Sequence, residues 1–190
     1  MPGKNNSAFL VMDVQEGIVK SLGEKAKGFI EKVTKAVEVA RAAGLPVIFI
    51  VVRFREGLPE MNHRNKMFER IKNNPQYSLE ENSSDTRPVI SPKQNELVVA
   101  KKRVSAFAGS DLEMLLQSQG ITDLVLCGIA TSGVVLSTTR AAADKDYSIT
   151  ILSDCCADRD EEVNRVLLEK VFPNQASVVT SEEWERTLMI

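Results

Sequence analysis

Six short apolar runs, separated by segments with helical periodicity, constrain the fold of this 190-residue chain more than any other feature. The first run, SAFLVMDVQ, is apolar without alternation, which is typical of a parallel strand buried on both faces of a sheet. Strands that alternate with helices predict an α/β fold in which a six-stranded parallel sheet lies between two layers of helices. The expected strands are residues 7–15, 45–54, 96–102, 123–128, 148–154 and 176–180.

Four helices are expected between these strands. Apolar residues recur at helical spacing over residues 29–40, and Gly44 ends that helix. In the segment SDLEMLLQSQG, Ser110 and Glu113 match a capping box and Gly120 marks the end of the helix. No repeat or linker interrupts the alternation, so we expect a single domain over residues 1–190. The other two helices are predicted at residues 131–145 and 160–172.

Residues 53–92 do not fit the alternation. This segment is polar and contains several prolines, and its sequence predicts no definite secondary structure. A long insertion of this kind in a compact domain is usually functional or mobile. His63 lies within it and is expected to be exposed.

Charge and the amino-terminal sequence narrow the class of partner. The chain has 24 Lys and Arg against 26 Asp and Glu, so a net charge of -2 gives no electrostatic reason to expect nucleic acid or an anionic membrane. The first apolar stretch ends at Asp13, too soon for a signal-peptide core or a membrane span. We therefore expect a cytoplasmic protein whose partner is a small molecule.

The three cysteines form neither a disulfide framework nor a C-x-x-C pattern, so we interpret them as reduced thiols. Cys127 ends an apolar strand and is most simply a core residue. Cys155 and Cys156 follow Asp154 at a strand end, not at a helix N-terminus that would lower a thiol pKa. The vicinal pair is a weaker candidate for thiol chemistry.

Candidate functional residues lie at the carboxyl ends of three strands. In open parallel sheets, ligands bind outside these ends, so Asp13, Lys101 and the turn at 128–134 should meet in one crevice. An acid after a strand is often only a cap or a surface residue. Lys101 is followed by Lys102 and Arg103, as in an ordinary solvated charge run. The three together are a stronger signal than any of them alone.

Four stretches, AFLVMDVQ, VVAKKRVSAFAGSDLEMLL, LVLCGIATSGVVLSTTRAAADKDY and ITILSDCCAD, resemble the isochorismatase-like hydrolase (cysteine hydrolase) superfamily, in order and over nearly the whole chain. This superfamily includes nicotinamidases, N-carbamoyl amidohydrolases and isochorismatases. The resemblance implies a Rossmann-like three-layer α/β/α fold, Asp13 as catalytic acid/base and Lys101 as catalytic lysine. It also implies a cis peptide bond between Ile129 and Ala130, and a homo-oligomer, at least a dimer.

The chain departs from its amidohydrolase relatives at the nucleophile. Those enzymes carry a cysteine on the first turn of the helix, at the position of Val134. A valine side chain cannot attack a carbonyl, which excludes the thiol-dependent nicotinamidase reaction. Members of that group also bind a metal through an Asp-x-His pair and another His. Since this chain has only His63, and VVRFREG where the pair is expected, we predict no metal and no cofactor.

Without the cysteine and the metal-binding pair, the expected site still has an acid, a base and a helix N-terminus. The isochorismatase branch also lacks the cysteine and is understood to cleave a vinyl ether by protonation from the aspartic acid and attack by water. It commonly has glycine where this chain has Val134, which argues against the same substrate. Thr131 and Ser132 are candidates to replace the missing cysteine, although their side chains are most simply helix caps. Its backbone N–H groups favour a carboxylate or a developing oxyanion, and the expected substrate-binding residues are Ile129, Ala130, Thr131, Ser132 and Gly133.

Two functions stand out. The first is a hydrolase of a small metabolite that uses Asp13 and Lys101 for acid/base chemistry without a cysteine nucleophile. The alternative is a non-catalytic relative that binds a metabolite or a protein partner; redox or thiol-transfer chemistry at Cys155 and Cys156 is a third, weaker possibility. A closed cavity in which Asp13 and Lys101 face each other favours an enzyme, whereas a pocket filled by Val134 and its neighbours favours a binder. The expected packing residues are Met12, Phe107 and Trp184.

Overall fold

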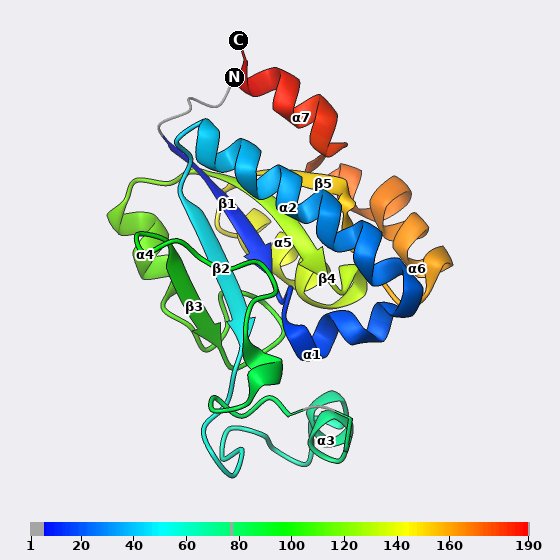
Figure 1. Ribbon diagram of the computed structural model, residues 1–190. Helices are drawn as coiled ribbons and strands as arrows, with labels where there is room; N and C mark the ends of the chain where they lie inside the picture. Colours follow the sequence, from blue (N-terminus) through cyan, green and yellow to red (C-terminus); the bar gives the residue numbers. More distant parts are fainter. Residues whose placement is uncertain (1–5, 77, 190) are drawn as a thin grey trace.

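The structure, a computed structural model, describes residues 6–76 and 78–189. Six strands form one sheet in the order β3-β2-β1-β4-β5-β6, and every neighbouring pair is parallel (Figure 1). The direction of winding reverses between β1 and β4, which makes the carboxyl end of these two strands the switch point of the sheet. The predicted α/β fold is confirmed. The strands are β1 (Ser7–Met12), β2 (Val47–Val52), β3 (Leu97–Lys101), β4 (Asp123–Ile129), β5 (Ser148–Ala157) and β6 (Ser177–Val179).

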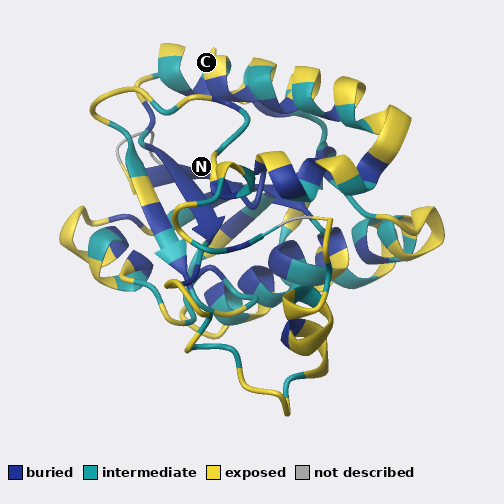
Figure 2. Ribbon diagram, turned by 60° about the horizontal axis from the view of Figure 1, so that its bottom comes forward, coloured by how far each residue is buried: buried dark blue, intermediate teal, exposed yellow. Residues whose placement is uncertain are grey.

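Helices cover both faces of the sheet (Figures 1 and 2). Successive side chains of a strand point to opposite faces, so β1 serves two cores: Phe9 and Val11 pack with α2 and α7, and Leu10 packs with α4 and α5. All six residues of β1 are buried, which explains its unbroken apolar sequence. The helices are α1 (Glu16–Val19), α2 (Ala26–Ala42), α3 (Lys66–Lys72), α4 (Leu112–Ser118), α5 (Leu136–Ala143), α6 (Glu161–Val166) and α7 (Ser181–Leu188).

The predicted capping box of α4 is wrong. The helix begins at Leu112 with Asp111 as its N-cap, and the side chain of Asp111 makes no capping hydrogen bond. The Ser110 hydroxyl donates instead to the carbonyl of Ala106, at 2.5 Å. Glu113 forms an ion pair with Lys145, at 2.8 Å. Ser110 Oγ accepts from the N–H of Leu112, at 3.4 Å, and not from that of Glu113, so the reciprocal pair of the capping box does not form.

The predicted helices at 131–145 and 160–172 are each interrupted by a π-helical turn. The first consists of Thr131–Val135 ahead of α5, and the second, Leu167–Val171, follows α6. The short helix α1 and the C-terminal helix α7 were not predicted. Trp184 of α7 is buried and packs against Phe9 with ring centroids 5.3 Å apart, so its predicted packing role is confirmed.

The insertion contains α3, which the sequence did not predict. A small apolar cluster holds it to the end of β2; its buried members are Val52, Phe54, Phe68 and Leu79. The far end of the insertion is fixed by the buried side chain of Gln15, whose Nε2 donates to the carbonyls of Val52 and Thr86. His63 is exposed, as expected. Within the described residues, no helix has the length and apolar character needed to cross a membrane.

Candidate active site

Asp13 and Lys101 meet at the carboxyl edge of the sheet. Asp13 directly follows β1 and Lys101 ends β3, on either side of β2. Lys101 Nζ lies 2.9 Å from Asp13 Oδ2, and the two side chains are only 2% and 10% exposed. Lys101 Nζ also donates to the carbonyl of Arg103, at 3.0 Å. The predicted convergence of these two residues is therefore observed.

The backbone aims Asp13 at this edge. Its φ of 56° lies in the left-handed region, which residues other than glycine seldom adopt. The Asp13 N–H donates to the carbonyl of Ile50, and the Asp13 carbonyl accepts from the N–H of Gln15, both at 2.9 Å. These bonds fix the turn that follows β1. A strained conformation that is held this firmly is common at functional sites.

The two carboxylate oxygens of Asp13 have different surroundings. Burial raises the pKa of the Asp13 carboxyl, and the charge and hydrogen bond of Lys101 oppose that rise. Oδ2 is paired with Lys101, whereas Oδ1 is buried without a hydrogen-bond partner among the described residues. A buried polar atom without a hydrogen-bond partner is unusual in a native protein. Oδ1 is thus the carboxylate oxygen that no described residue engages.

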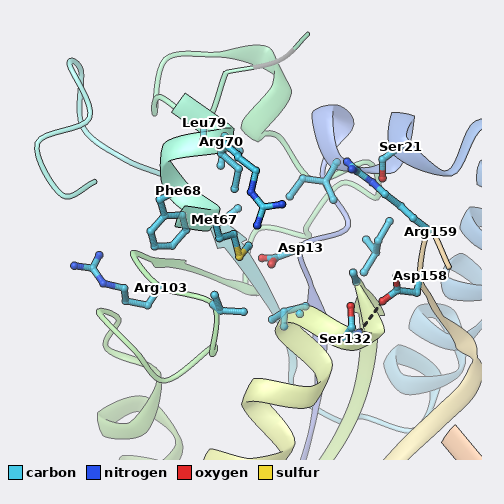
Figure 3. A pocket seen from close by; sticks show the side chains of 18 of the residues that line it. Asp13, Ser21, Met67, Phe68, Arg70, Leu79, Arg103, Ser132, Asp158 and Arg159 are labelled. Carbon is cyan, nitrogen blue, oxygen red and sulfur yellow. Dashed lines mark hydrogen bonds between the residues drawn. The ribbon is translucent and has the colours of Figure 1, made fainter. Parts of the chain in front are cut away.

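A cavity of about 480 Å³ opens beside this pair (Figure 3). Its walls come from the turn after β4, from α3 and from the segment after β5. This volume is within the range of small-molecule sites. Seven of the eight predicted site residues line it, namely Asp13, Lys101, Ile129, Ala130, Ser132, Gly133 and Val134. Thr131 does not: it is fully buried, and its hydroxyl donates to Asn164 Oδ1 at 2.5 Å.

The turn after β4 lies close to β1. The peptide bond between Ile129 and Ala130 is cis, as the resemblance implied. Gly128 is paired with Met12, and a Cβ at this glycine would come within 2.2 Å of the Met12 carbonyl oxygen. Only glycine therefore permits this approach of the two strands.

The helix N-terminus differs from the prediction. The N–H of Ser132 donates to Asp158 Oδ2 at 2.8 Å, so the protein's own carboxylate takes part of the expected anion site. The N–H of Gly133 donates to the carbonyl of Ala130 at 3.0 Å. The predicted capping by the side chains of Thr131 and Ser132 is wrong, because neither caps the turn and Asp158 supplies the acceptor.

Val134 occupies the position of the nucleophilic cysteine in the resembling enzymes. Its side chain is 1% exposed and packs within the apolar core between the sheet and α5. It borders the cavity without filling it. The criterion set from the sequence is a closed cavity in which Asp13 faces Lys101. The two residues face each other and Val134 does not fill the cavity, which favours an enzyme, but the cavity is partly open.

None of the three thiols lines the cavity. Cys127 is fully buried, which confirms its core role, and burial raises its pKa. Burial likewise raises the pKa of Cys155 to about 12, and that of Cys156 further. The two side chains pack on opposite faces of the sheet. The vicinal pair is therefore poorly suited to nucleophilic or redox chemistry.

In the segment VVRFREG, two arginines stand where the metal-binding Asp-x-His pair of the resembling enzymes would be expected. Arg53 lies near the carbonyl of Thr86, with Nη2 3.5 Å away, and Arg55 forms an ion pair with Glu60 at 2.6 Å. Throughout residues 6–76 and 78–189, no three His, Cys, Asp or Glu side chains are grouped so that they could hold a metal ion.

Among the charged residues that line the cavity, sequence reasoning did not assign Arg70, Arg103, Asp158 or Arg159 to the site. The acid and the arginine after β5 lie at the same sheet edge as Asp13, and that position was a usable signal. Helix α3 also carried a signal, since Asn65 precedes it as an N-cap and accepts from the N–H of Phe68.

Comparison with known proteins agrees with the fold. A cysteine hydrolase from Pseudomonas syringae pv. phaseolicola superposes with a TM-score of 0.87 at 21% identity, covering 98% of this chain and 94% of that one. An uncharacterized isochorismatase family protein of Escherichia coli O157:H7 is 28% identical over 93% of both chains. A protein of Arabidopsis thaliana named probable inactive nicotinamidase is 26% identical over 96% of both chains. The isochorismatase domain model matches residues 7–183, and the chain therefore belongs to the isochorismatase family.

Proposed function

We propose that this protein hydrolyses a small metabolite by acid/base chemistry at Asp13, with Lys101 holding the carboxylate and without a cysteine nucleophile. The observation that carries the proposal is the asymmetry of the Asp13 carboxyl group. Oδ2 is held by Lys101, the buried Oδ1 has no partner among the described residues, and Asp13 lines the cavity.

Each step of such a hydrolysis has a group to perform it. Because burial raises the pKa of Asp13, its carboxyl is protonated more readily than an ordinary one and can give a proton to the substrate. Lys101 stabilises the carboxylate that remains. Water then attacks the substrate and the bond to the leaving group breaks. The proton that the water loses returns to Asp13, so the enzyme ends the cycle unchanged and forms no covalent intermediate.

One observation favours a second candidate, a non-catalytic protein that binds a metabolite. Val134 is buried where amidohydrolase relatives carry their nucleophile, and the Arabidopsis thaliana relative is named probable inactive nicotinamidase. A fold alone does not establish activity. The Asp13–Lys101 pair beside a cavity that Val134 does not fill favours the hydrolase. A homo-oligomeric state and a cytoplasmic location stay predictions.

The experiment begins with a metabolite library screened for ligands that raise the melting temperature, followed by turnover assays on the hits. On a substrate so found, Asp13→Asn is expected to lower kcat/KM by about 10²- to 10⁴-fold, the usual contribution of positioned acid/base catalysis. The control Asp111→Asn makes the same acid-to-amide change at an exposed residue and leaves kcat/KM unchanged. Thiol alkylation also leaves turnover largely intact.

Three outcomes would contradict the proposal. Full activity in Asp13→Asn would show that Asp13 is structural. Ligands that bind and are never turned over would favour the non-catalytic alternative. An acyl adduct on Cys155 or Cys156, seen by mass spectrometry together with loss of activity on alkylation, would move the site to the thiols.

A further inference from the structure

We propose that Arg70 makes this cavity a receptor for a small molecule with an apolar body and a carboxylate group. The assignment of that molecule as a substrate rests on the proposed function, whereas its binding does not. Arg70 belongs to α3, in the insertion that the acid/base chemistry does not use.

The charges around the cavity do not balance. Asp13 and Lys101 form a pair that is neutral overall. This leaves the one negative charge of Asp158 against the positive charges of Arg70, Arg103 and Arg159. Arg70 and Arg159 also line the cavity, and within the described part of the chain neither forms an ion pair. The whole chain has a net charge of -2, so this positive charge is local to the cavity. A cleft lined by charge of one sign attracts ligands of the opposite sign.

The two arginines approach the cavity from different sides (Figure 3). Arg70 reaches from α3 toward Asp13, whereas Arg159 extends from the other wall toward Ser21. Arg70 Nε donates to the carbonyl of Lys66 at 3.2 Å, which anchors the side chain within its own helix. The Nη groups are left for a ligand. A carboxylate bound there would hold the rest of the molecule next to Asp13.

Arg103 is a poorer candidate, although it also lines the cavity. Its guanidinium points away from Asp13 in Figure 3. It lies 5.8 Å from the centre of the Phe68 ring and donates to the carbonyl of Lys102 at 2.6 Å. We therefore assign the carboxylate to Arg70.

The remaining walls indicate the body of the ligand. Apolar side chains from several parts of the chain line the cavity, and they include Ile18, Val52, Phe68, Leu79, Val104 and Val134. Such a surface favours an apolar body. The guanidinium of arginine presents a planar fork of donors that matches a carboxylate. Together these features select a small aromatic or alkenyl acid over its neutral analogue.

Calorimetric titration with matched probes tests this inference: benzoate against benzamide, and trans-crotonate against crotonamide. Wild-type protein should prefer the carboxylate of each pair. Arg70→Gln is expected to weaken carboxylate binding about 10-fold or more, the worth of one charged hydrogen bond, and to leave amide binding unchanged. Arg70→Lys should keep part of the preference, because it retains the charge without the fork. The control Arg64→Gln removes the same charge from an exposed position of the insertion outside the cavity and should change nothing.

Three results would overturn the inference: equal affinity for acid and amide, an equal loss in Arg64→Gln and Arg70→Gln, or no binding of either acid at millimolar concentration. Its failure is distinct from failure of the hydrolase proposal. If Asp13→Asn abolishes turnover and Arg70→Gln keeps the carboxylate preference, the hydrolase stands and this inference fails. If Arg70→Gln removes the preference and no substrate is ever turned over, the reverse holds.

Discussion

The carboxyl edge of the sheet and the insertion at residues 53–92 face the same cavity but are built differently. Asp13 and Lys101 lie at the ends of strands within the main core, and every residue of β1 and β2 is buried. In α3 only Phe68 is buried. The first region fixes side chains by dense packing around them, whereas the second presents side chains from a small cluster at the surface.

This difference separates two tasks. Acid/base chemistry needs a side chain held in one place, which the sheet provides at Asp13. Recognition of a particular ligand depends on surface residues that can be substituted without loss of the fold. Loops on a rigid scaffold carry such residues. Because α3 has few buried apolar contacts, it should open at a lower free energy than the sheet unfolds. The predictions below test this contrast, from the largest expected effect to the smallest.

Lys101→Met should have the largest effect on stability, because it leaves the buried Asp13 charge without its partner. Breaking a buried ion pair in this way costs about 3–5 kcal/mol of unfolding free energy. Urea denaturation at pH 7 measures the loss. Lys102→Met is the control; that side chain is partly exposed, and we expect its loss to be about 1 kcal/mol or less.

The loss in Lys101→Met should depend on pH with a definite sign. Burial raises the pKa of Asp13, and the substitution removes the charge that opposes this rise. Between the ordinary pKa and the raised one, the folded variant binds more protons than the unfolded chain, so its stability falls as pH increases. The deficit should therefore shrink below the raised pKa. A deficit that is constant with pH would mean that another interaction of Lys101 is responsible.

Phe68→Ala should loosen the insertion and spare the sheet. Phe68 packs edge-on against Phe54, with ring centroids 5.5 Å apart. We expect a loss of about 1–3 kcal/mol, less than for an aromatic deep in a core, since α3 can detach locally. Hydrogen exchange should quicken over residues 66–72 and stay unchanged in β1 and β4.

Met67→Ala is the matched control for Phe68→Ala, because Met67 is the preceding residue of α3 and is 43% exposed. Its effect on unfolding should stay within about 0.5 kcal/mol. If Phe68→Ala instead speeds exchange in the strands equally, the insertion and the sheet unfold as one unit, and the contrast between the two regions fails.

Asp85→Asn should have the smallest effect. The Asp85 carboxylate accepts from Lys20 at 2.8 Å and from the N–H of Ser78 at 3.1 Å, which ties the insertion to the scaffold. Lys20 is mostly exposed, so we expect a loss of about 0.2–1 kcal/mol. A double-mutant cycle with Lys20→Gln measures the interaction, and strictly additive losses would show that this tie contributes nothing.

The pH dependence of this tie has the opposite sign to that of Asp13. The hydrogen bond from Lys20 holds the pKa of Asp85 below its ordinary value. Its stabilisation is present above the ordinary pKa of aspartate and is lost as pH falls through the lowered one. The difference in stability between wild type and Asp85→Asn should therefore vanish in acid.

The sequence by itself determined the six strands, their parallel arrangement and the sheet edge that holds the site. Periodicity reports how a segment is buried, and runs such as residues 7–12 are apolar because both faces of the strand are covered. The meeting of Asp13 and Lys101 also followed, because the carboxyl ends of parallel strands share one edge. The same reasoning placed Cys127 and Trp184 in the core.

Only the tertiary structure decided which groups reach into the cavity. The hydrogen bond from the Ser132 N–H to the Asp158 carboxylate joins residues 26 positions apart, and no local sequence pattern predicts it. Arg70 reaches the cavity because Phe54, Phe68 and Leu79 hold α3 near the end of β2. Local periodicity reports the burial of each segment against its own neighbours, whereas these contacts depend on how distant turns and helices pack against one another.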